Sequence, residues 1–452
     1  MEETKNLTQG RVLPTLIEFG LPVLLAMFLQ ALYGGVDLLI VGQFGTTMDV
    51  SGVSTGSMLL HTITNIIVGL TMGVTVFVGQ KIGENKPEEA GKAIGTGLYL
   101  FTILGIVLSV ITIIFTKPLA TLLHAPEEAF SQTCDYIRVC GVGLIFIVFY
   151  NLLGAIFRGI GDSKTPLLTV AIACVINILA DLFFVSILNM GAFGAAVATV
   201  LAQALSVIIS LIIIINKSKT TKLPFTFHRR YIKLDVTYIK AELKLGTPIA
   251  LQDFLVGASF LVIQTVVNSL GLVASAGVGV AEKICGFIML IPSAIAQSLS
   301  AFVAQNIGAG LLKRAKLSLK CGIGISFVMA CFIGTFSFFR GDILASIFTK
   351  DFDVITSGHT YLKAFAIDTF FTAFMFCFVG YFNGMGKTFF TMVQGLIGGI
   401  AIRVPMVFLM KSLPNTNLFL IGLSTPIATF CQILMCFGYY FYIRKKDKLL
   451  QN

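Results

Sequence analysis

Charged residues are scarce in this sequence. Asp, Glu, Lys and Arg together make up 12% of the 452 residues, whereas soluble globular proteins carry about 25%. Hydrophobic residues make up 56% of the chain, and most of them lie in long runs. This composition excludes an ordinary soluble globular protein and indicates a membrane protein.

Recognisable disulfide and metal-binding motifs are also missing. The nine cysteines include no CxxC pair, have no histidines clustered near them and lie mostly within apolar runs. No HExxH sequence occurs, and the chain has only four histidines. We therefore predict that the cysteines are small core residues, and we expect no metal site and no cofactor.

The chain has no polar stretch long enough for a nucleotide-hydrolysing domain. YFNGMGKT at 381–388 resembles a phosphate-binding loop, but Tyr381 replaces its first glycine and no strand precedes it. GVSTG at 52–56 matches the GxSxG motif of hydrolases in letters only, because it opens an apolar segment and not a strand-to-helix turn. We predict that the protein is no enzyme and that an ion gradient supplies its energy.

Apolar segments long enough to cross a bilayer as helices recur along the whole chain. The first has no clear small-residue cleavage site and is predicted to be a retained span, not a signal peptide. The sequence predicts an all-α, polytopic membrane protein with twelve transmembrane helices in two pseudo-symmetric six-helix lobes. The predicted spans are 13–43, 52–79, 93–116, 134–157, 166–188, 193–215, 244–269, 277–304, 318–340, 360–382, 389–410 and 418–442.

Lysine and arginine are unevenly distributed among the predicted connections. If the amino terminus is cytoplasmic, 24 of the 32 basic residues fall in cytoplasmic segments and six in exterior ones, with Lys283 and Arg403 left inside spans. Because basic residues favour the cytoplasmic side, we expect both termini and the 216–244 segment to be cytoplasmic, in the plasma membrane. The net charge of +10 then reflects membrane orientation, and no nucleic-acid partner is expected.

The second half of the sequence repeats the first. We divide the chain into an amino-terminal lobe (1–215), a cytoplasmic linker (216–243) and a carboxy-terminal lobe (244–452). An even number of spans gives both copies the same orientation, an arrangement found in transporters with substrate expected between the halves. Three sequences recur at a nearly constant offset in the numbering: FVGQKIG (77–83) as FVAQNIG (302–308), FRGIG (157–161) as FNGMG (382–386), and FGLP (19–22) as LGTP (245–248).

Two acids lie within predicted spans of the first half. Burying an ionised carboxylate at the centre of a span costs at least about 2.5–3.5 kcal/mol, so Asp37 needs a role or a partner. Gln30 and Tyr33 precede it by seven and four residues and share its helix face. Asp181 in the fifth span has Asn177 four residues before it. Because no Lys or Arg lies deep in a span of this half, we interpret the two acids as proton-binding groups.

The second half carries charges of both signs within its predicted spans, namely Asp253, Glu282, Lys283, Asp368 and Arg403. Glu282 and Lys283 are adjacent and cannot face each other on one helix. A structural ion pair and a part in ion coupling or substrate binding are both open for this set.

These sequences resemble the multidrug and toxic compound extrusion (MATE) family. The resemblance rests on twelve spans in two halves, a first span with a proline that ends in GGVDLLIVGQFG, the FVGQKIG end of the second span, and FRGIGDSKTP with its degenerate copy FNGMGKT. It covers essentially the whole chain. It implies a secondary antiporter that exports amphipathic, often cationic drugs or dyes against an inward flow of H⁺ or Na⁺.

The resemblance also implies an ion-coupling site. In proton-coupled members, acids of the first and fifth spans form this site with nearby polar residues. The matching positions here are Asp37, Asp181, Asn177, Gln30, Tyr33 and, in the sixth span, Thr199.

The sodium-type pattern of the family is matched less well. It places acids in the seventh and tenth spans where this sequence has Val256 and Thr372, and Asp253 and Asp368 lie about one turn earlier. We therefore expect H⁺ coupling rather than Na⁺ coupling.

A lipid-linked precursor flippase of the same superfamily is the alternative. Such proteins line a more cationic cavity, for which only Lys283 and Arg403 are available. A membrane-embedded enzyme or a channel has no motif in its favour. We expect a monomer in the lipid bilayer.

Overall fold

The computed structural model describes residues 6–220 and 223–449. In these two ranges the regular structure is helical, and twelve helical segments are long and apolar enough to cross a membrane. The predicted all-α fold class and the twelve spans are therefore confirmed. Lys5 and Lys222, two of the basic residues used to predict the orientation, lie outside the described residues.

The chain divides into two compact units. Unit 1 comprises Met1–Ala250 and Ala304–Leu312, and unit 2 comprises Leu251–Val303 and Lys313–Asn452. The helices α8 (Val236–Asn268) and α9 (Leu272–Gly308) are divided between the units, and α10 (Leu312–Ser346) has its first residue in unit 1. The division predicted from the sequence repeat, with lobes at 1–215 and 244–452 and a linker at 216–243, remains a prediction.

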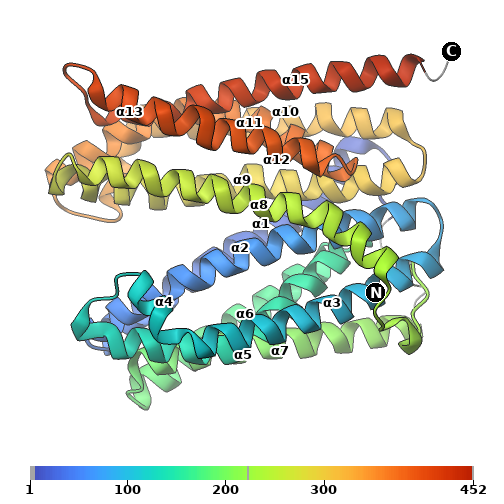
Figure 1. The fold of residues 1–452 in the computed structure, drawn as a ribbon, viewed down its shortest axis with the longest axis horizontal. Helices are drawn as coiled ribbons and strands as arrows, with labels where there is room; N and C mark the ends of the chain where they lie inside the picture. The colour runs from blue at the N-terminus through green and yellow to red at the C-terminus, as the bar shows by residue number, and fades with distance from the viewer. Residues whose placement is uncertain (1–5, 221–222, 450–452) are drawn as a thin grey trace. The chain divides into compact units, whose positions relative to one another are not determined.

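Besides its parts of α8 and α9, the described part of unit 1 contains seven α-helices, α1 to α7, which Figure 1 labels. Helices α2, α3 and α5 pack against one another, α5 packs on α7, and α6 lies between α1 and α7. The bounds are α1 (Val12–Phe44), α2 (Thr47–Gly83), α3 (Pro87–Ile114), α4 (Thr116–Leu122), α5 (Phe130–Gly159), α6 (Lys164–Asp181) and α7 (Gly191–Thr220), with the 3₁₀ turns η1 (Glu127–Ala129) and η3 (Arg229–Tyr231) and the π-helix η2 (Leu182–Ile187).

Unit 2 contains the remaining elements. Helix α11 packs along α15, and one span is continuous through α12, a π-helical segment and α13. The bounds are α10 (Leu312–Ser346), α11 (Phe352–Gly384), α12 (Thr388–Leu396), the π-helix η4 (Ile397–Arg403), α13 (Val404–Ser412), α14 (Leu418–Gly422) and α15 (Ser424–Leu449).

Most of the membrane helices are longer than the apolar segments that predicted them. Helix α2 runs over Thr47–Gly83, whereas its apolar segment covers 52–79. Helix α8 begins at Val236, inside the range predicted as linker. Hydropathy detects only the part of a helix that suits hydrocarbon, whereas backbone hydrogen bonding continues into the polar ends.

The repeat is visible in matching hydrogen bonds. The Thr75 hydroxyl in α2 donates to the main-chain oxygen of Ala155 in α5 at 2.9 Å. In unit 2 the Ser300 hydroxyl in α9 donates to the main-chain oxygen of Gly380 in α11 at 3.1 Å. The two donors and the two acceptors are separated by the same offset in the numbering. Each copy therefore joins its second and fourth spans in the same way.

The structure explains why both glycines of FRGIG and of FNGMG are glycine. A methyl group on Gly159 or Gly384 would stand 3.0 or 2.7 Å from a main-chain oxygen of the facing second span. Gly161 and Gly386 adopt φ of 86° and 73° in the turn that follows, a conformation that side chains disfavour. The motif thus permits close helix packing followed by a tight turn.

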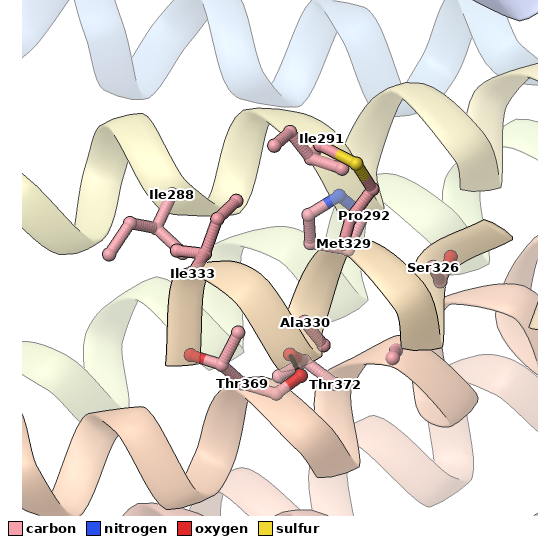
Figure 2. A pocket seen from close by; sticks show the side chains of 10 residues that line it. Ile288, Ile291, Pro292, Ser326, Met329, Ala330, Ile333, Thr369 and Thr372 are labelled. Carbon is pink, nitrogen blue, oxygen red and sulfur yellow. Dashed lines mark hydrogen bonds between the residues drawn. The ribbon is translucent and has the colours of Figure 1, made fainter. Parts of the chain in front are cut away.

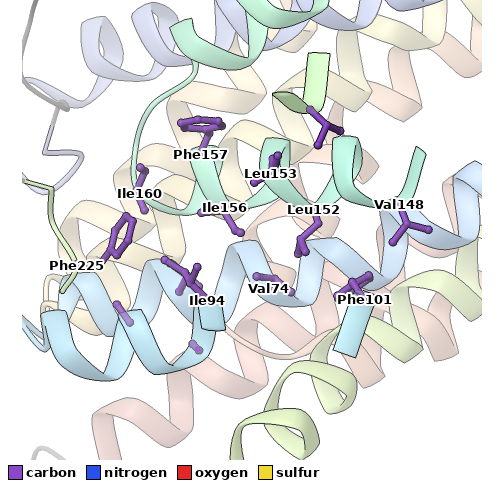
Figure 3. Close-up of a cluster of buried hydrophobic side chains, with 14 of the residues drawn as sticks. Val74, Ile94, Phe101, Val148, Leu152, Leu153, Ile156, Phe157, Ile160 and Phe225 are labelled. Atoms are coloured by element: carbon purple, nitrogen blue, oxygen red, sulfur yellow. The ribbon is translucent and has the colours of Figure 1, made fainter. Parts of the chain in front are cut away.

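The largest apolar cluster of unit 1 lies where α2, α3 and α5 meet (Figure 3). Phe101, Leu152 and Phe157 are fully buried there. Phe225, from the segment that precedes α8, packs against the same cluster. Because lipid is as apolar as these side chains, close packing and not exclusion from water stabilises such a contact within the bilayer. The connecting segment is therefore fastened to unit 1.

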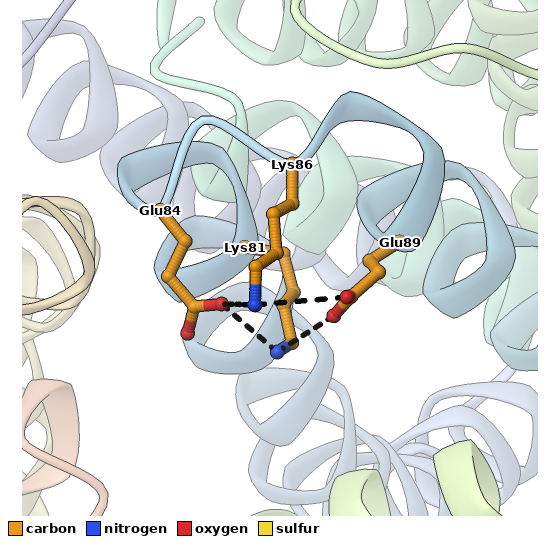
Figure 4. A network of polar contacts seen from close by, with 4 residues as sticks. All are labelled: Lys81, Glu84, Lys86 and Glu89. Atoms are coloured by element: carbon orange, nitrogen blue, oxygen red, sulfur yellow. Dashed lines mark hydrogen bonds and ion pairs between the residues drawn. The ribbon is translucent and has the colours of Figure 1, made fainter.

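An ion-pair network joins the end of α2 to the start of α3 (Figure 4). Lys81 lies 3.1 Å from Glu84 and 2.9 Å from Glu89, and Lys86 lies 2.9 and 3.6 Å from the same two acids. Partial burial disfavours the ionised form of Glu84, but hydrogen bonds from Lys86 and Lys81 outweigh it and hold the pKa of this carboxyl below its ordinary value. The hydrogen bond with Glu84 raises the pKa of Lys86.

Candidate functional site

The acids predicted as proton-binding groups lie together in unit 1. Helix α1 carries Asp37 and α6 ends at Asp181, and the two helices pack against each other. Asp37 is 5% exposed and Asp181 is fully buried. Two carboxyl groups from different parts of the sequence thus share one buried place.

Polar side chains from three helices surround Asp37. Thr199 of α7 donates a hydrogen bond to Oδ2 of Asp37 at 3.1 Å. Asn177 and Asp181 of α6 are close enough to interact with the Asp37 carboxyl, but neither makes a hydrogen bond of ordinary geometry with it. Within the described chain, Oδ1 of Asp37 and both carboxyl oxygens of Asp181 have no hydrogen-bond partner. The acids are therefore enclosed but incompletely satisfied.

A second polar group lies about one turn from Asp37 along α1. Gln203 of α7 donates a hydrogen bond to the Tyr33 hydroxyl at 3.2 Å. Gln30 also lies beside this hydroxyl, and Tyr33 is near enough to Asp37 to feel its charge. The structure therefore brings together all six residues that the resemblance implied for the coupling site.

The two acids have no basic partner in the part of the chain that the structure describes. Among the ion pairs of residues 6–220 and 223–449, none includes Asp37 or Asp181. An isolated carboxylate is costly to bury, whereas the neutral acid is far less so. Binding of a proton or another small cation is the chemistry that suits the arrangement.

The helix that carries Asp181 changes its geometry directly after the acid. Residues Leu182–Ile187 form the π-helix η2, which contacts both α1 and α7. Short π-helical segments within α-helices occur frequently at functional sites. The wider turn begins at the residue that follows the carboxyl.

Unit 2 has a buried polar centre of different composition. Arg403, at the end of η4, donates a hydrogen bond to the Ser259 hydroxyl at 2.9 Å, and its guanidinium lies 4.4 Å from the ring centroid of Phe260. Asp368 of α11 is close enough to interact electrostatically with Arg403 and is also buried. Tyr361 lies near both. Here an acid and a base are present together.

The other charged residues of unit 2 are placed differently. Glu282 is half-buried and interacts with Tyr361 at the edge of this centre. Asp253 and Lys283 are exposed, and among the described residues neither forms an ion pair or hydrogen bond with the centre. The structure thus groups Asp368 and Glu282 with Arg403 and leaves Asp253 and Lys283 apart.

Comparison with known proteins agrees with this arrangement. The family model MatE matches residues 22–183 and again residues 248–409, once in each half of the repeat. The chain belongs to the MatE family. Membership places the protein among multi-pass membrane transporters and not among enzymes.

Relatives of this MatE chain match it over nearly its whole length. Probable multidrug resistance protein YpnP of Bacillus subtilis (strain 168) is 28% identical over 441 residues, which cover 98% of this chain and 97% of YpnP. Probable multidrug resistance protein YoeA of the same strain is 26% identical over 444 residues, covering 95% and 94%. A solved structure of a multidrug resistance MATE family transporter in an outward-facing conformation superposes with a TM-score of 0.91 over all of both chains, at 19% identity. This last likeness concerns the fold.

Two residues beside the site of this MatE protein were not predicted from its sequence. Gln203 lies four residues after Thr199 on α7, so helical spacing could have indicated it. Tyr136 of α5 lies beside Thr199 and both carboxyls, but nothing local in the sequence marks it. Its position depends on how α5 packs against α7.

The region around Thr372, where the sodium-type pattern has an acid, is a recess in unit 2 (Figure 2). It is formed by α9, α10 and α11 and has a volume of about 260 Å³ including the space at its mouth. Its lining consists of apolar side chains with the hydroxyls of Ser326, Thr369 and Thr372. A recess without a carboxylate is a poor cation site, because hard cations prefer charged oxygen ligands.

Proposed function

We propose that this MatE protein is a proton-coupled multidrug efflux antiporter that exports amphipathic, often cationic compounds by alternating access. The observation that carries the proposal is the pair Asp37 and Asp181, buried together in unit 1 with no basic partner among the described residues. Several relatives are named as multidrug resistance or multidrug export proteins, which supports drugs or dyes as the substrate class.

Asp37 is proposed to be the principal proton-binding group. A transporter needs a group that is charged in one state and neutral in another, and a buried carboxyl without a counter-charge meets this need. Thr199, Asn177 and Asp181 adjoin it, and a proton shared with Asp181 would satisfy two of the oxygens that lack partners. Gln30 and Tyr33 extend the same site along α1.

Proton binding is proposed to bend α1. Pro22 lies within α1, and a proline inside a helix removes one hydrogen bond and favours a kink. A methyl group added to Gly34 or Gly35 would meet no atom within 4 Å, so this part of α1 has room to move. A bend there would displace Asp37 and expel the bound drug.

The orientation belongs to the same proposal. The distribution of basic residues favours cytoplasmic termini, so the proton would enter from outside and the drug would leave in that direction. In unit 2, Asp368 has Arg403 beside it and the recess at Thr372 has no carboxylate. These two features favour H⁺ coupling in unit 1 over Na⁺ coupling in unit 2. We expect a monomer.

Transport in proteoliposomes tests the function. An imposed proton gradient should drive movement of a fluorescent cationic dye, and adding dye should release protons from the purified protein. A protonophore should abolish transport, whereas replacing Na⁺ by K⁺ should leave it unchanged. Transport that follows a sodium gradient alone would overturn the choice of ion, and export restricted to anionic compounds would overturn the substrate class.

A further inference from the structure

A third acid of unit 1 is buried apart from the coupling site. Glu242 lies on α8, six residues before Pro248, and is 1% exposed. Within the described chain, neither of its carboxyl oxygens has a hydrogen-bond partner. The residue falls in the range that the sequence assigned to the linker, where an exposed acid would be expected.

The start of α8 is seated on α2 by backbone contact. A methyl group on Gly73 would stand 2.5 Å from the main-chain oxygen of Glu242 and 2.6 Å from the main-chain nitrogen of Gly246. One on Gly69 would stand 2.5 Å from Cα of Ala250. Gly69 and Gly73 of α2 therefore meet Ala250 and Gly246 of α8. Pairs of small residues four apart permit such close helix packing in membranes.

The carboxyl group of Glu242 lies over α3 at this seam. Its two oxygens are 3.5 and 3.6 Å from the position that a Cβ of Gly97 would occupy. The contact of α8 with α2 and α3 thus encloses the Glu242 carboxyl between two helices that present glycines to α8. Among the described residues, no base lies close enough to offset the charge of this carboxyl.

The titratable groups nearest along these helices are engaged elsewhere. Tyr238 of α8 packs its ring against Phe77 of α2, and Lys92 of α3 pairs with Glu88 at 3.1 Å. Lys240 and Lys244 of α8 are exposed. On the α2 face of the seam the contacting residues are glycines and Leu70, none of which titrates.

The repeat shows that this place does not require an acid for packing. Pro248 in the second copy corresponds to Pro22 in the first, so Glu242 corresponds to Leu16, which stands at the same distance before its proline. Leu16 in α1 is buried too, at 3% exposure. Because a leucine fills the equivalent position in the first copy, packing alone does not explain why the second copy has a carboxyl group there.

We propose that Glu242 is a further proton-binding site, whose neutral form fastens the start of α8 to α2 and α3 and whose ionised form releases it. Ionisation would place a charge without a partner between Gly73 and Gly97, and such a charge is far more costly to bury than the neutral acid. The proton passes to water that enters the opened seam. Protonation at Glu242 thereby controls whether α8 is held before Pro248.

Hydrogen exchange of the full-length protein in lipid nanodiscs tests the proposal. Wild type, Glu242→Gln and Glu242→Leu are compared at equal pH from acidic to alkaline, by mass spectrometry of the 236–250 segment. The Gln variant imitates the neutral acid, and the Leu variant copies position 16. We expect equal exchange at acidic pH and, at alkaline pH, faster exchange in wild type than in either variant. Glu88→Gln, at an exposed ion pair, is the matched control and should behave as wild type.

Infrared spectroscopy gives a second readout. Wild type should show a protonated-carboxyl band that decreases as pH rises and that both Glu242 variants lack but Asp37→Asn retains. Exchange that is the same in wild type and variants at every pH, or a spectrum without a Glu242-dependent band, would overturn the proposal. Should both variants fail to fold, wild type decides: exchange of 236–250, corrected for its intrinsic pH dependence, must rise with pH.

The link to transport rests on the proposed function, but the two can fail separately. If dye transport were independent of protons while the Glu242-dependent exchange persisted, the proposed function alone would be wrong. If Asp37→Asn abolished transport and the exchange showed no dependence on Glu242, the further inference alone would be wrong.

Discussion

The polar centres of the two units differ in the group that accompanies the acids. Unit 1 has a neutral amide, Asn177, beside the Asp37 carboxyl, whereas unit 2 has a base, Arg403, near Asp368. In unit 2 the guanidinium donates a hydrogen bond to Ser259, lies over the ring of Phe260 and partly offsets the charge of Asp368.

This difference separates two uses of a buried acid. Loading a proton on Asp37 removes an uncompensated negative charge from its site, because no base among the described residues opposes that charge. Arg403 lies near enough to Asp368 to oppose its charge and so lowers the cost of its ionised form, although burial disfavours that form. One fold repeated twice thus provides a centre suited to titration and a centre suited to holding helices together.

The largest expected effect is at Asp37. Asp37→Asn keeps the size of the side chain and much of its hydrogen bonding but removes titration. Proton-driven dye export in proteoliposomes should fall to the level of empty liposomes, with dye binding partly retained. Asp135→Asn, at a partly exposed acid paired with Arg138, should transport normally. Wild-type transport by Asp37→Asn with unchanged pH dependence would contradict the proposed role.

Arg403 should govern stability more than coupling. Arg403→Met removes a charged hydrogen bond to Ser259 and leaves buried Asp368 without its nearby base, which should cost at least about 1.5–3 kcal/mol. Thermal unfolding in detergent should show the loss, and the double variant Arg403→Met with Asp368→Asn should recover most of it. If the single variant were fully stable but unable to couple protons, the contrast between the units would be refuted.

A smaller contrast concerns the turn after the fourth span of each copy. In unit 1, Lys217 donates hydrogen bonds to Asp162 at 2.5 Å and to Thr165 at 2.9 Å. At the corresponding turn of unit 2, the uncharged Thr391 hydroxyl donates a hydrogen bond to Oδ1 of Asn383 at 2.8 Å. Lys217→Met should cost about 1.5–3 kcal/mol, since the bonds involve a charged group, and Asn383→Ala about 0.5–1.5 kcal/mol. Equal losses in thermal unfolding would remove this distinction.

The smallest effect is expected at the exposed network of the α2–α3 connection. The second copy has no acid between Gln305 and Lys320, whereas unit 1 has Glu84 with its lowered pKa. A lowered pKa in the folded state contributes stability above the unfolded-state pKa, and this contribution is lost as the pH falls through the folded value. Glu84→Gln should change the stability at neutral pH by less than about 1 kcal/mol.

The pH dependence of the stability difference between wild type and Glu84→Gln shows whether the ion pairs of Glu84 cause it. The difference in melting temperature between wild type and Glu84→Gln should shrink when the solution is acidified. A difference that grows in acid would show that the ion pairs are not its source.

The sequence by itself determined the number of spans, the repeat and the unusual acids. Each of these follows from local chemistry: a bilayer needs about 20 apolar residues per helix, and a carboxyl group within such a run is costly enough to stand out. The helix spacing of Gln30, Tyr33 and Asp37 required only the period of an α-helix. Family resemblance then supplied Thr199, which the structure places on Asp37.

Only the tertiary structure decided which polar groups are compensated. The contact of Arg403 with Ser259 joins residues 144 positions apart, and that of Gln203 with Tyr33 joins residues 170 apart. The enclosure of Glu242 arises because glycines on α2 admit α8 to backbone contact and Gly97 on α3 leaves room for the carboxyl group. Hydropathy and periodicity describe one helix at a time, whereas burial and charge compensation depend on the rotation and closeness of its neighbours. For this reason a residue that sequence places in a polar linker is buried in unit 1, with no partner among the described residues.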